Sequence, residues 1–329
     1  MRYLHKQGGA MEINWLHDFI AVASARSFSR AAEQRNSSQP ALSRRIKALE
    51  VWAGAALFER TTHAVSLTPA GDAFRLTAED IVRRLSAGRL EAQELARGAS
   101  DVLKFASTNA LSLTFFPDWL RGIETMLSFV PNVQLVANHM EACERMLLAG
   151  EVHFLLCHHH PAVVTALTTS QFRSAHVGDD CLIPASVPAS RSGRAARFRL
   201  PGTEAAPVQV LSYRQESGMG KILDAVRSTS PLGAHLKPAF TSHLAKLLVT
   251  MVQAGRGMAW LPESLIVDQL ASGALVKAGG QEWEIPIEIR VFRPRSRLTP
   301  AAEAFWTHVQ EHPPPSSPRK APRVRRSRG

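Results

Sequence analysis

The sequence predicts two folds in one chain: a small, mostly helical domain over residues 13–67 and an α/β domain over residues 99–311. Three observations support this. Two short helix patterns lie on either side of a polar break within 27–53, and an apolar stripe spaced 4-3-4 runs through 74–95. From about residue 100 onward, strand-like and helix-like segments alternate, which is typical of an α/β domain.

Length, composition and charge fit this division. A chain of 329 residues exceeds one typical domain, and 45% hydrophobic residues are enough to form folded cores. The net charge of +11 is localised. Residues 312–329 carry six basic residues and no acid, and segment 26–60 carries seven basic residues against three acids. A polyanionic partner is therefore expected near these two segments.

The ends of the chain and its location are expectations of the same kind. The sequence contains no run of 18 apolar residues, so no membrane span is expected. Residues 1–10 also lack the apolar core of a secretory signal. A cytoplasmic protein without membrane contact is therefore expected. Residues 1–12 are expected to form a disordered extension. The alternative is that the true start codon is Met11, in which case residues 1–10 do not belong to the protein. The tail 312–329 is rich in Pro, Ser and Arg and should be disordered, either adding DNA affinity or only solubility.

The helix pattern that begins after Ser38 is the most informative element of the predicted helical domain. Ser38 is a suitable N-cap, and Pro40 lies in the first turn, where its missing N–H has no cost. The inner stripe consists of Leu42, Ile46, Leu49 and Ala53. The outer face carries long polar and basic side chains suited to base edges in a major groove, while an ordinary amphipathic helix with a solvated face would show the same periodicity.

The flanking segments favour the DNA-reading interpretation. Before this helix, Phe28–Ala32 forms a short helix capped by Ser27 or Ser29, and after it residues 64–67 alternate like a strand. A hairpin there would be a wing, with Arg60 placed to reach the DNA backbone or the minor groove. The predicted DNA-contacting residues are Ser27, Ser29, Arg30, Ser38, Gln39, Pro40, Ser43, Arg44, Lys47 and Arg60.

The motifs in this region resemble those of the LysR-type transcriptional regulators. The matching segments are Phe28–Ala32, Ser38–Glu50, Gly54–Arg60 and Leu67–Gly71. The resemblance implies a winged helix-turn-helix over 13–67, a linker helix over 68–98 and a two-subdomain effector-binding domain over 99–311, like a periplasmic solute-binding protein. It also implies a dimer or tetramer that binds an operator sequence. One departure is Arg35, where the family usually has Leu; we expect it at the edge of the turn, able to contact a phosphate.

The segment after Leu67 predicts a long helix that pairs with a second copy. Thr68 and Pro69 suit an N-cap and first position, Asp72 lies in the first turn, and Gly98 closes the helix after Arg97. Its 4-3 spacing is that of a coiled-coil seam, which needs a partner to be buried. The predicted dimerisation residues are Phe74, Ile81, Leu85 and Leu95.

The α/β part predicts a largely parallel sheet and a ligand site at its carboxyl edge. Expected strands cover 102–106, 133–137 and 152–156, with helices over 112–126 and 141–148 and further alternation over 208–213, 240–250, 257–261 and 285–292. The resemblance implies one subdomain from 100–172 and 273–311 and another from 173–272. The predicted effector-binding residues are Ser107, Thr108, Asn109, Tyr213, Thr241 and Ser242, each of which could instead cap a helix.

Histidine and sulfur side chains give weaker indications. His158, His159 and His160 are adjacent, and successive strand residues point in alternate directions, so neither a metal site nor a cofactor is expected. Three scattered cysteines are expected to be structural thiols. The segments 110–113, 212–213, 219–220 and 259–263 also resemble hypochlorite-responsive members of the family, which would make Met219 a candidate redox residue; a Met filling a gap in the core is the alternative.

Two other classes of protein fit the α/β pattern less well. An exported solute-binding protein would need a signal peptide and no basic head. An α/β enzyme would need a nucleophile elbow or a phosphate loop, and neither motif occurs in the sequence, so no enzyme activity is expected. The expected partners are double-stranded DNA, a second copy of the chain, and an unidentified small molecule or oxidant, with RNA polymerase as a further candidate.

Overall fold

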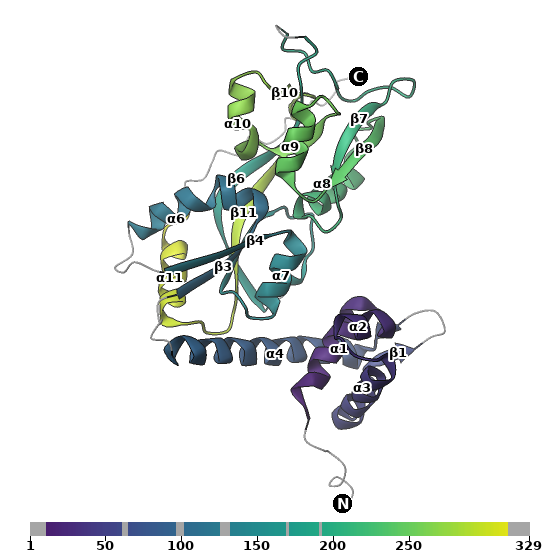
Figure 1. Cartoon of the computed structure of the whole chain (residues 1–329), viewed down its shortest axis with the longest axis vertical. Helices are drawn as coiled ribbons and strands as arrows, with labels where there is room; N and C mark the ends of the chain where they lie inside the picture. The colour runs from purple at the N-terminus through teal and green to yellow at the C-terminus, as the bar shows by residue number, and fades with distance from the viewer. Residues whose placement is uncertain are drawn as a thin grey trace, which may run out of the picture. The chain divides into compact units, whose positions relative to one another are not determined.

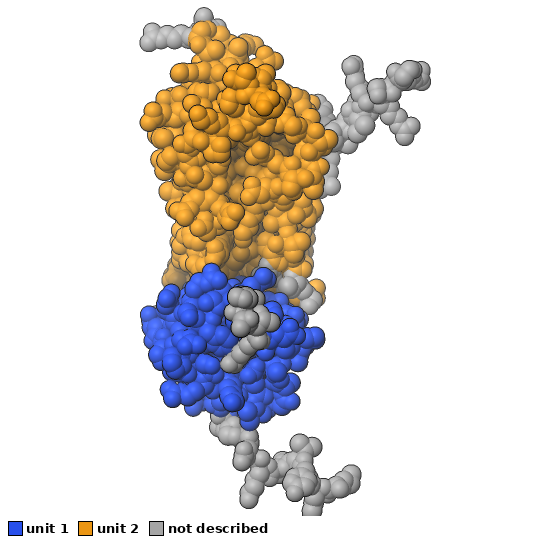
Figure 2. Space-filling view, turned by 90° about the vertical axis from the view of Figure 1, so that its right-hand side faces the viewer, with its two compact units in different colours: residues 1–97, 148–151 blue, residues 98–147, 152–329 orange. Residues whose placement is uncertain are grey.

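The computed structural model describes residues 11–60, 65–96, 102–125, 132–168, 171–190 and 193–314. The chain divides into two compact units (Figure 2): residues 1–97 with 148–151, and residues 98–147 with 152–329. Each unit has hydrophobic clusters of its own. Among the described residues, no helix is both long and apolar enough to cross a bilayer. Most of the expected N-terminal extension, most of the basic tail and the expected helix end at Gly98 lie outside the described residues.

The first unit is a helical bundle with a two-stranded wing (Figure 1). Its elements are α1 (Ile13–Ala25), α2 (Phe28–Gln34), α3 (Gln39–Ala53), β1 (Phe58–Arg60), β2 (Val65–Leu67) and α4 (Pro69–Ala96). β1 and β2 pair antiparallel. The predicted stripe of α3 is confirmed, since Leu42, Ile46 and Leu49 are fully buried. The predicted cap is confirmed too, because the Ser38 hydroxyl accepts a hydrogen bond from the Ala41 amide at 3.4 Å.

The junction between the wing and α4 is tightly fixed. The Thr68 hydroxyl donates to the Ala56 carbonyl at 2.8 Å and accepts from the Gly71 amide at 2.9 Å. A Cβ at Gly71 would lie 2.1 Å from the Leu57 carbonyl oxygen. Only glycine therefore allows the first turn of α4 to approach the wing so closely.

The second unit is built on a mixed seven-stranded sheet, not on a largely parallel one as predicted. The strand order is β10-β6-β11-β5-β3-β4, with β9 also paired to β6. The strands are β3 (Val102–Thr108), β4 (Asn132–Asn138), β5 (Phe154–His159), β6 (Phe172–Ser186), β9 (Ala259–Pro262), β10 (Val276–Lys277) and β11 (Ile285–Pro294). Only β3 with β4 and β3 with β5 pair parallel among the described strands of this sheet, because β6 and β11 run against their neighbours.

A second, smaller parallel sheet joins β7 (Val208–Tyr213) to β8 (Leu236–Ser242). The helices of this unit are α5 (Asn109–Thr114), α6 (Phe116–Glu124), α7 (Met140–Leu148), α8 (Gly218–Thr229), α9 (Ala245–Gln253), α10 (Glu263–Ala271) and α11 (Pro300–Glu311). Figure 1 shows α8 and α9 beside β7 and β8, and α6 and α11 at the other end of the large sheet.

Two hydrophobic cores lie in this unit, and β6 and β11 contribute to both. Val177 and Ile289 belong to one core, and Leu182 and Ile285 belong to the other. The subdomain boundary expected at residue 172 is therefore crossed by a continuous strand. Neither this long strand nor helices α8, α10 and α11 were predicted.

The helix predicted over 112–126 is in fact two helices that meet at Phe115. α5 begins three residues earlier, at Asn109, and α6 begins at Phe116 with Pro117 in its first turn. Proline lacks an amide hydrogen and clashes with a preceding turn, so it starts a new helix here. The segment 240–250 likewise divides into the end of β8 and the start of α9.

Substituting Gly71 with Ala should destabilise the first unit by about 1–3 kcal/mol, because the new methyl group meets a backbone carbonyl that cannot move freely. Gly88, in the same helix, has no atom within 4 Å of the position that a Cβ would take, so Gly88→Ala should add about 0.5–1 kcal/mol of helix stability. Hydrogen exchange of α1–α3 amides in urea measures both. Equal effects of the two substitutions would contradict the close contact.

Candidate nucleic-acid interface and ligand cleft

The outer face of α3 presents polar and basic side chains opposite its buried stripe. Gln39, Arg44 and Lys47 are exposed, and Ser43 is half-exposed beside them. Ser38 and Pro40 are also exposed at the start of the helix. Because α3 is held by its three buried residues, this face can enter a groove without disturbing the core.

The other predicted DNA contacts lie at the start of α2 and in the wing. The Ser27 hydroxyl accepts from the Arg30 amide at 3.4 Å, which identifies Ser27, and not Ser29, as the cap of α2. Ser29 and Arg30 are exposed. Arg60 ends β1, and its side chain lies outside the described residues. The structure therefore brings Arg30 and the N-terminal turns of α3 to accessible positions.

A buried carboxylate, not foreseen from the sequence, fixes the turn between α2 and α3. Asp18 in α1 is 1% exposed and accepts from Arg35 Nε at 3.0 Å and from Arg45 Nε. Arg45 also donates to the Ser37 hydroxyl at 3.0 Å. Arg35 lies at the edge of the turn, where we expected it, since it is the C-cap of α2 and its side chain is 32% exposed, but its guanidinium pairs with Asp18. An acid on the apolar face of 13–25 was the signal in the sequence that could have revealed this pair.

The wing is held to α3 by a second acid. One carboxylate oxygen of Glu50 accepts from the Leu57 amide at 2.9 Å and from the Phe58 amide at 3.2 Å. Satisfying two amides that would otherwise lack partners fixes where β1 begins. The wing therefore keeps a set position relative to the outer face of α3.

The apolar stripe of α4 serves two purposes. Phe74 packs within its own unit, with its ring 5.4 Å from Phe19 and 6.4 Å from Trp52 between centroids. Ile81 and Leu85 are 38% and 56% exposed. The side chain of Leu95 lies outside the described residues. Of the predicted dimerisation residues, Ile81 and Leu85 are therefore the ones seen to be available to a partner.

In the second unit, several helices begin around one cleft. It is lined by the first residues of α5, α7, α8 and α9, which are Asn109, Met140, Gly218 and Ala245. The other lining residues are Thr108, Ala110, Asn138, His139, His158, Tyr213, Ser217, Met219 and His243. The cleft is partly open to solvent.

Three of the six predicted effector residues line this cleft, and the other three do not. Thr108, Asn109 and Tyr213 line the cleft. Ser107 is fully buried and donates to the Thr108 carbonyl, and the Ser242 hydroxyl accepts from the Leu244 amide at 3.0 Å. Neither these two nor the exposed Thr241 is among the lining residues. His139, His158 and His243 were missed, because the sequence showed histidines only as a possible metal cluster.

Three polar atoms of the cleft wall are buried without a hydrogen-bond partner. They are the Thr108 hydroxyl oxygen, the Tyr213 hydroxyl oxygen and Nδ1 of His158. Burial, and secondarily the nearby Asp180 carboxylate, raises the pKa of Tyr213, so its hydroxyl stays protonated. Unsatisfied buried polar atoms are costly, and a ligand can satisfy them.

His158 is held from behind by a hydrogen-bonded acid. Its Nε2 lies 3.0 Å from one carboxylate oxygen of Asp180, and both side chains are almost fully buried. The Ser264 hydroxyl donates to the same oxygen at 2.6 Å. Burial alone would raise the pKa of Asp180, but hydrogen bonds from His158, Ser264 and the Cys181 amide together lower it. The acid is therefore an ionised acceptor near neutral pH.

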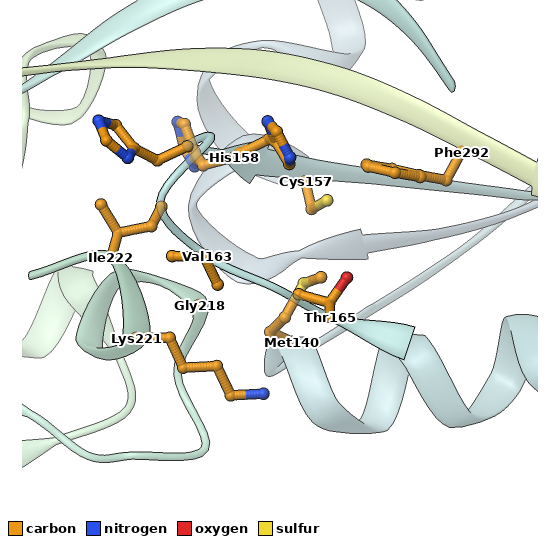
Figure 3. Close-up of a pocket in the computed structure, with 11 residues that line it drawn as sticks. Met140, Cys157, His158, Val163, Thr165, Gly218, Lys221, Ile222 and Phe292 are labelled. Carbon is orange, nitrogen blue, oxygen red and sulfur yellow. The ribbon is translucent and has the colours of Figure 1, made fainter. Parts of the chain in front are cut away.

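His158 also lines a neighbouring pocket. Figure 3 shows that pocket, where Met140 and Gly218 again contribute to the wall together with Cys157 and Lys221. His159 and His160 line this pocket too, but their nearest polar partners differ: His159 Nδ1 lies 3.9 Å from a carboxylate oxygen of Glu288, and His160 Nδ1 accepts from the Ala162 amide. Within the described residues, no group of three potential ligands could hold a metal ion.

The three cysteines are poorly reactive thiols. Burial raises the pKa of Cys143 to about 11 and that of Cys181 to about 12, and it also raises the pKa of Cys157. Thiolates, which are the nucleophilic form, are therefore scarce at neutral pH.

Comparison with known proteins agrees with both parts of this description. A family model described as "Bacterial regulatory helix-turn-helix protein, lysR family" matches residues 13–72, and one described as "LysR substrate binding domain" matches residues 96–314. The chain is 30% identical over 305 residues to the HTH-type transcriptional regulator YjiE of Escherichia coli, covering 92% of this chain and 95% of that protein.

Two solved structures are similar over most of their length. One is Vibrio fischeri DarR in complex with DNA, at 28% identity and a TM-score of 0.54, covering 92% of this chain and 99% of that one. The other is full-length HypT of Salmonella typhimurium, described as a hypochlorite-specific LysR-type regulator, also at 28% identity and 0.54, covering 92% and 98%.

Replacing Asp18 with Asn should lower the free energy of unfolding of the first unit by about 2 kcal/mol, since two charged hydrogen bonds to a buried acceptor are weakened. Arg35→Leu should cost less, because Asp18 keeps Arg45 and the guanidinium of Arg35 is about one-third exposed. Hydrogen exchange of α1–α3 amides in urea gives the change in unfolding free energy for both variants. A larger effect of Arg35→Leu than of Asp18→Asn would contradict the role of Asp18 as the acceptor shared by both arginines.

Proposed function

Since the chain belongs to the LysR family of bacterial helix-turn-helix transcriptional regulators, we propose that it reads operator DNA with the outer face of α3 and responds to a ligand held in the cleft of its second unit. Members of this family are transcriptional regulators and not enzymes. The observation that carries the proposal is the exposed polar face on a helix whose opposite side is fully buried.

The chemistry of this face suits sequence recognition. Gln39 can pair bidentately with adenine and Arg44 with guanine, each contributing about 1–3 kcal/mol of discrimination. Lys47, one turn further, is a point charge suited to phosphate. Ser38 and the free amides of the first turn of α3 also suit a phosphate oxygen.

The exposed part of the α4 seam supports a symmetric dimer. Ile81 and Leu85 lie one turn apart on the surface, and a second copy would cover both. A two-fold axis would present two α3 helices to two half-sites of one operator. We also propose that the protein contacts RNA polymerase and that it is located in the cytoplasm.

Gln39→Ala and Arg44→Ala should each weaken operator binding about 10- to 100-fold and relax the preference at one base pair, because each removes a base contact. Lys47→Ala should weaken binding to all sequences equally and reduce the salt dependence. Lys246→Ala removes an exposed charge from the second unit and is the matched control. Fluorescence anisotropy with operator and scrambled DNA measures these effects; unchanged preference in both base-contact variants would refute the groove assignment.

The signal is either a bound small molecule or an oxidant. The second candidate is favoured by Met219, which lines the cleft while being only 7% exposed, and by the similarity to a protein described as hypochlorite-specific. Hypochlorite transfers its oxygen to a thioether sulfur and leaves as chloride. A sulfoxide at this position would replace the apolar thioether of Met219 with a polar group in the wall of the cleft and could shift the balance between two conformations.

Treatment with hypochlorite should convert Met219 to the sulfoxide and should change operator affinity. Peptide mass spectrometry and anisotropy measure the two effects. Met219→Leu should abolish the change in affinity, whereas Met251→Leu, a half-buried methionine of α9 outside the cleft, should not. A full response in Met219→Leu would eliminate oxidant sensing at this residue and leave the bound ligand as the signal.

A further inference from the structure

A short β-hairpin of the second unit carries arginines that the proposed function does not use. It covers residues 187–197 and follows directly on β6, at the point where β6 pairs with β10. The Ala189 amide donates to the Ala195 carbonyl at 2.8 Å, and the Arg197 amide donates to the Val187 carbonyl at 2.9 Å. These bonds join two antiparallel segments into a narrow ribbon, which projects beyond β10 at one end of the unit (Figure 1).

The hairpin and its flanks are strongly basic. Segment 181–203 contains four arginines and no acid. Arg191 lies outside the described residues, whereas Arg194, Arg197 and Arg199 are described and exposed. None of these three side chains forms an ion pair with a carboxylate in the part of the chain that the structure describes. Their positive charges are therefore available to a partner.

A further positive charge lies beside the hairpin. Nη1 of Arg197 is 3.2 Å from the position that a Cβ would take at Gly255, in the turn after α9. The next residue, Arg256, is exposed. Neighbouring like charges repel one another, and a polyanion that binds between them removes this repulsion. The arrangement therefore favours a partner with several negative charges.

The chemistry of the side chains favours phosphate. All the basic residues of the hairpin and of the adjacent turn are arginines, whose planar guanidinium can donate two parallel hydrogen bonds to one phosphate. Nucleic acids and membrane lipids both carry phosphates, but a membrane-binding hairpin also needs large apolar side chains that enter the lipid. The other exposed residues among those described in the hairpin are small: Ala189, Ser190 and Ala195. A nucleic acid is therefore the better match.

The shape of the hairpin matches duplex DNA, since a two-stranded ribbon fits the major groove or follows the edge of a groove. We propose that the hairpin over 187–197, with Arg194, Arg197 and the adjacent Arg199, is a second DNA-binding element that contacts backbone phosphates. This inference rests on the proposed function, because the first unit brings the duplex to the chain and so raises its effective concentration at the hairpin. Phosphate contacts add affinity without sequence preference.

The combined substitution Arg194→Gln, Arg197→Gln and Arg199→Gln tests the proposal in the full-length chain. The DNA probe is a duplex that the unmodified chain selects from a pool of random sequence. The slope of log affinity against log salt should become shallower by up to about 2.7 per chain, because each lost phosphate contact removes about 0.9. At 0.15 M salt the affinity should fall about 10- to 100-fold. A change in slope below about 0.9 per chain would overturn the proposal.

The matched control removes the same charge from exposed positions of the second unit outside the hairpin. It combines Arg121→Gln, Lys246→Gln and Arg297→Gln. The control should keep the slope of the unmodified chain. An equal loss of slope in both triple variants, each shown to be folded by circular dichroism, would mean that DNA senses only the net charge, and it would overturn the proposal.

Photochemical crosslinking locates the contact without removing the other two arginines. Arg194→Cys supplies a thiol for an aryl azide reagent, and the native cysteines compete poorly because burial raises the pKa of their thiols. Irradiation of the bound complex should join position 194 to the duplex. Lys246→Cys, labelled in the same way, should not crosslink. A labelled Arg194→Cys chain that binds the duplex without crosslinking would contradict the proposal.

The inference and the proposed function fail in different ways. If the unmodified chain selects no duplex, DNA binding itself is wrong and the second contact is lost with it. If the chain selects a duplex but the hairpin variant keeps the slope, only the second contact is lost. Binding to vesicles of phosphatidylserine and phosphatidylcholine is then measured, and a loss in the hairpin variant alone would assign the hairpin to a membrane surface instead of DNA.

Discussion

The antiparallel pairing of β6 with β11 is the interaction on which the second unit depends. The two strands are hydrogen-bonded from Phe172–Pro294 to Leu182–Ile285, with one irregularity beside Ile289. Both strands carry side chains into each of the two hydrophobic cores. The cores therefore cannot separate without breaking this ladder, yet a pair of strands can twist. The cleft therefore lies between two cores that this pair of strands holds together.

Buried carboxylates perform a similar role in both units, where each joins elements that are distant in sequence. Asp18 connects α1 to the turn before α3 and to α3 itself through Arg35 and Arg45. Asp180 connects β6 to β5 through His158 and to α10 through Ser264. Such groups are strongly unfavourable when unpaired, so they fix one arrangement of their neighbours more than they add net stability.

The sequence was sufficient for the first unit because its local signals agree with its tertiary structure. The cap at Ser38, the stripe of α3 and the helix after Thr68 depend on residues within a few turns of each other. The sheet of the second unit was less predictable, since strand direction is set by pairing between distant segments such as β6 and β11. A strand with consecutive buried residues, such as Leu182–Ser186, also lacks the alternation by which half-buried strands are recognised.

The residues of the cleft could also be predicted from the sequence only where local signals were sufficient. Thr108, Asn109 and Tyr213 could be proposed from the sequence because polar residues at strand ends are the usual donors in such folds. The role of His158 depends on Asp180, which is 22 residues away and reaches it only through the β5–β11–β6 order of the sheet. The adjacent His159 and His160 gave no indication of this pair, because their rings have partners of their own.

The position of His158 also explains how occupancy of the cleft could reach the rest of the chain. Its ring separates the cleft from Asp180, and Asp180 in turn holds Ser264 at the start of α10. Ser264 lies 3.3 Å from the hydroxyl of Thr114 at the end of α5, and α5 begins at the cleft. A ligand that bonds to Thr108, His158 and Tyr213 would thus connect β3, β5 and β7, which belong to both cores. Such a ligand shifts the conformational balance only as far as it binds one twist of β6 and β11 more tightly than another, so the polar atoms that select it are also those that couple it to the fold.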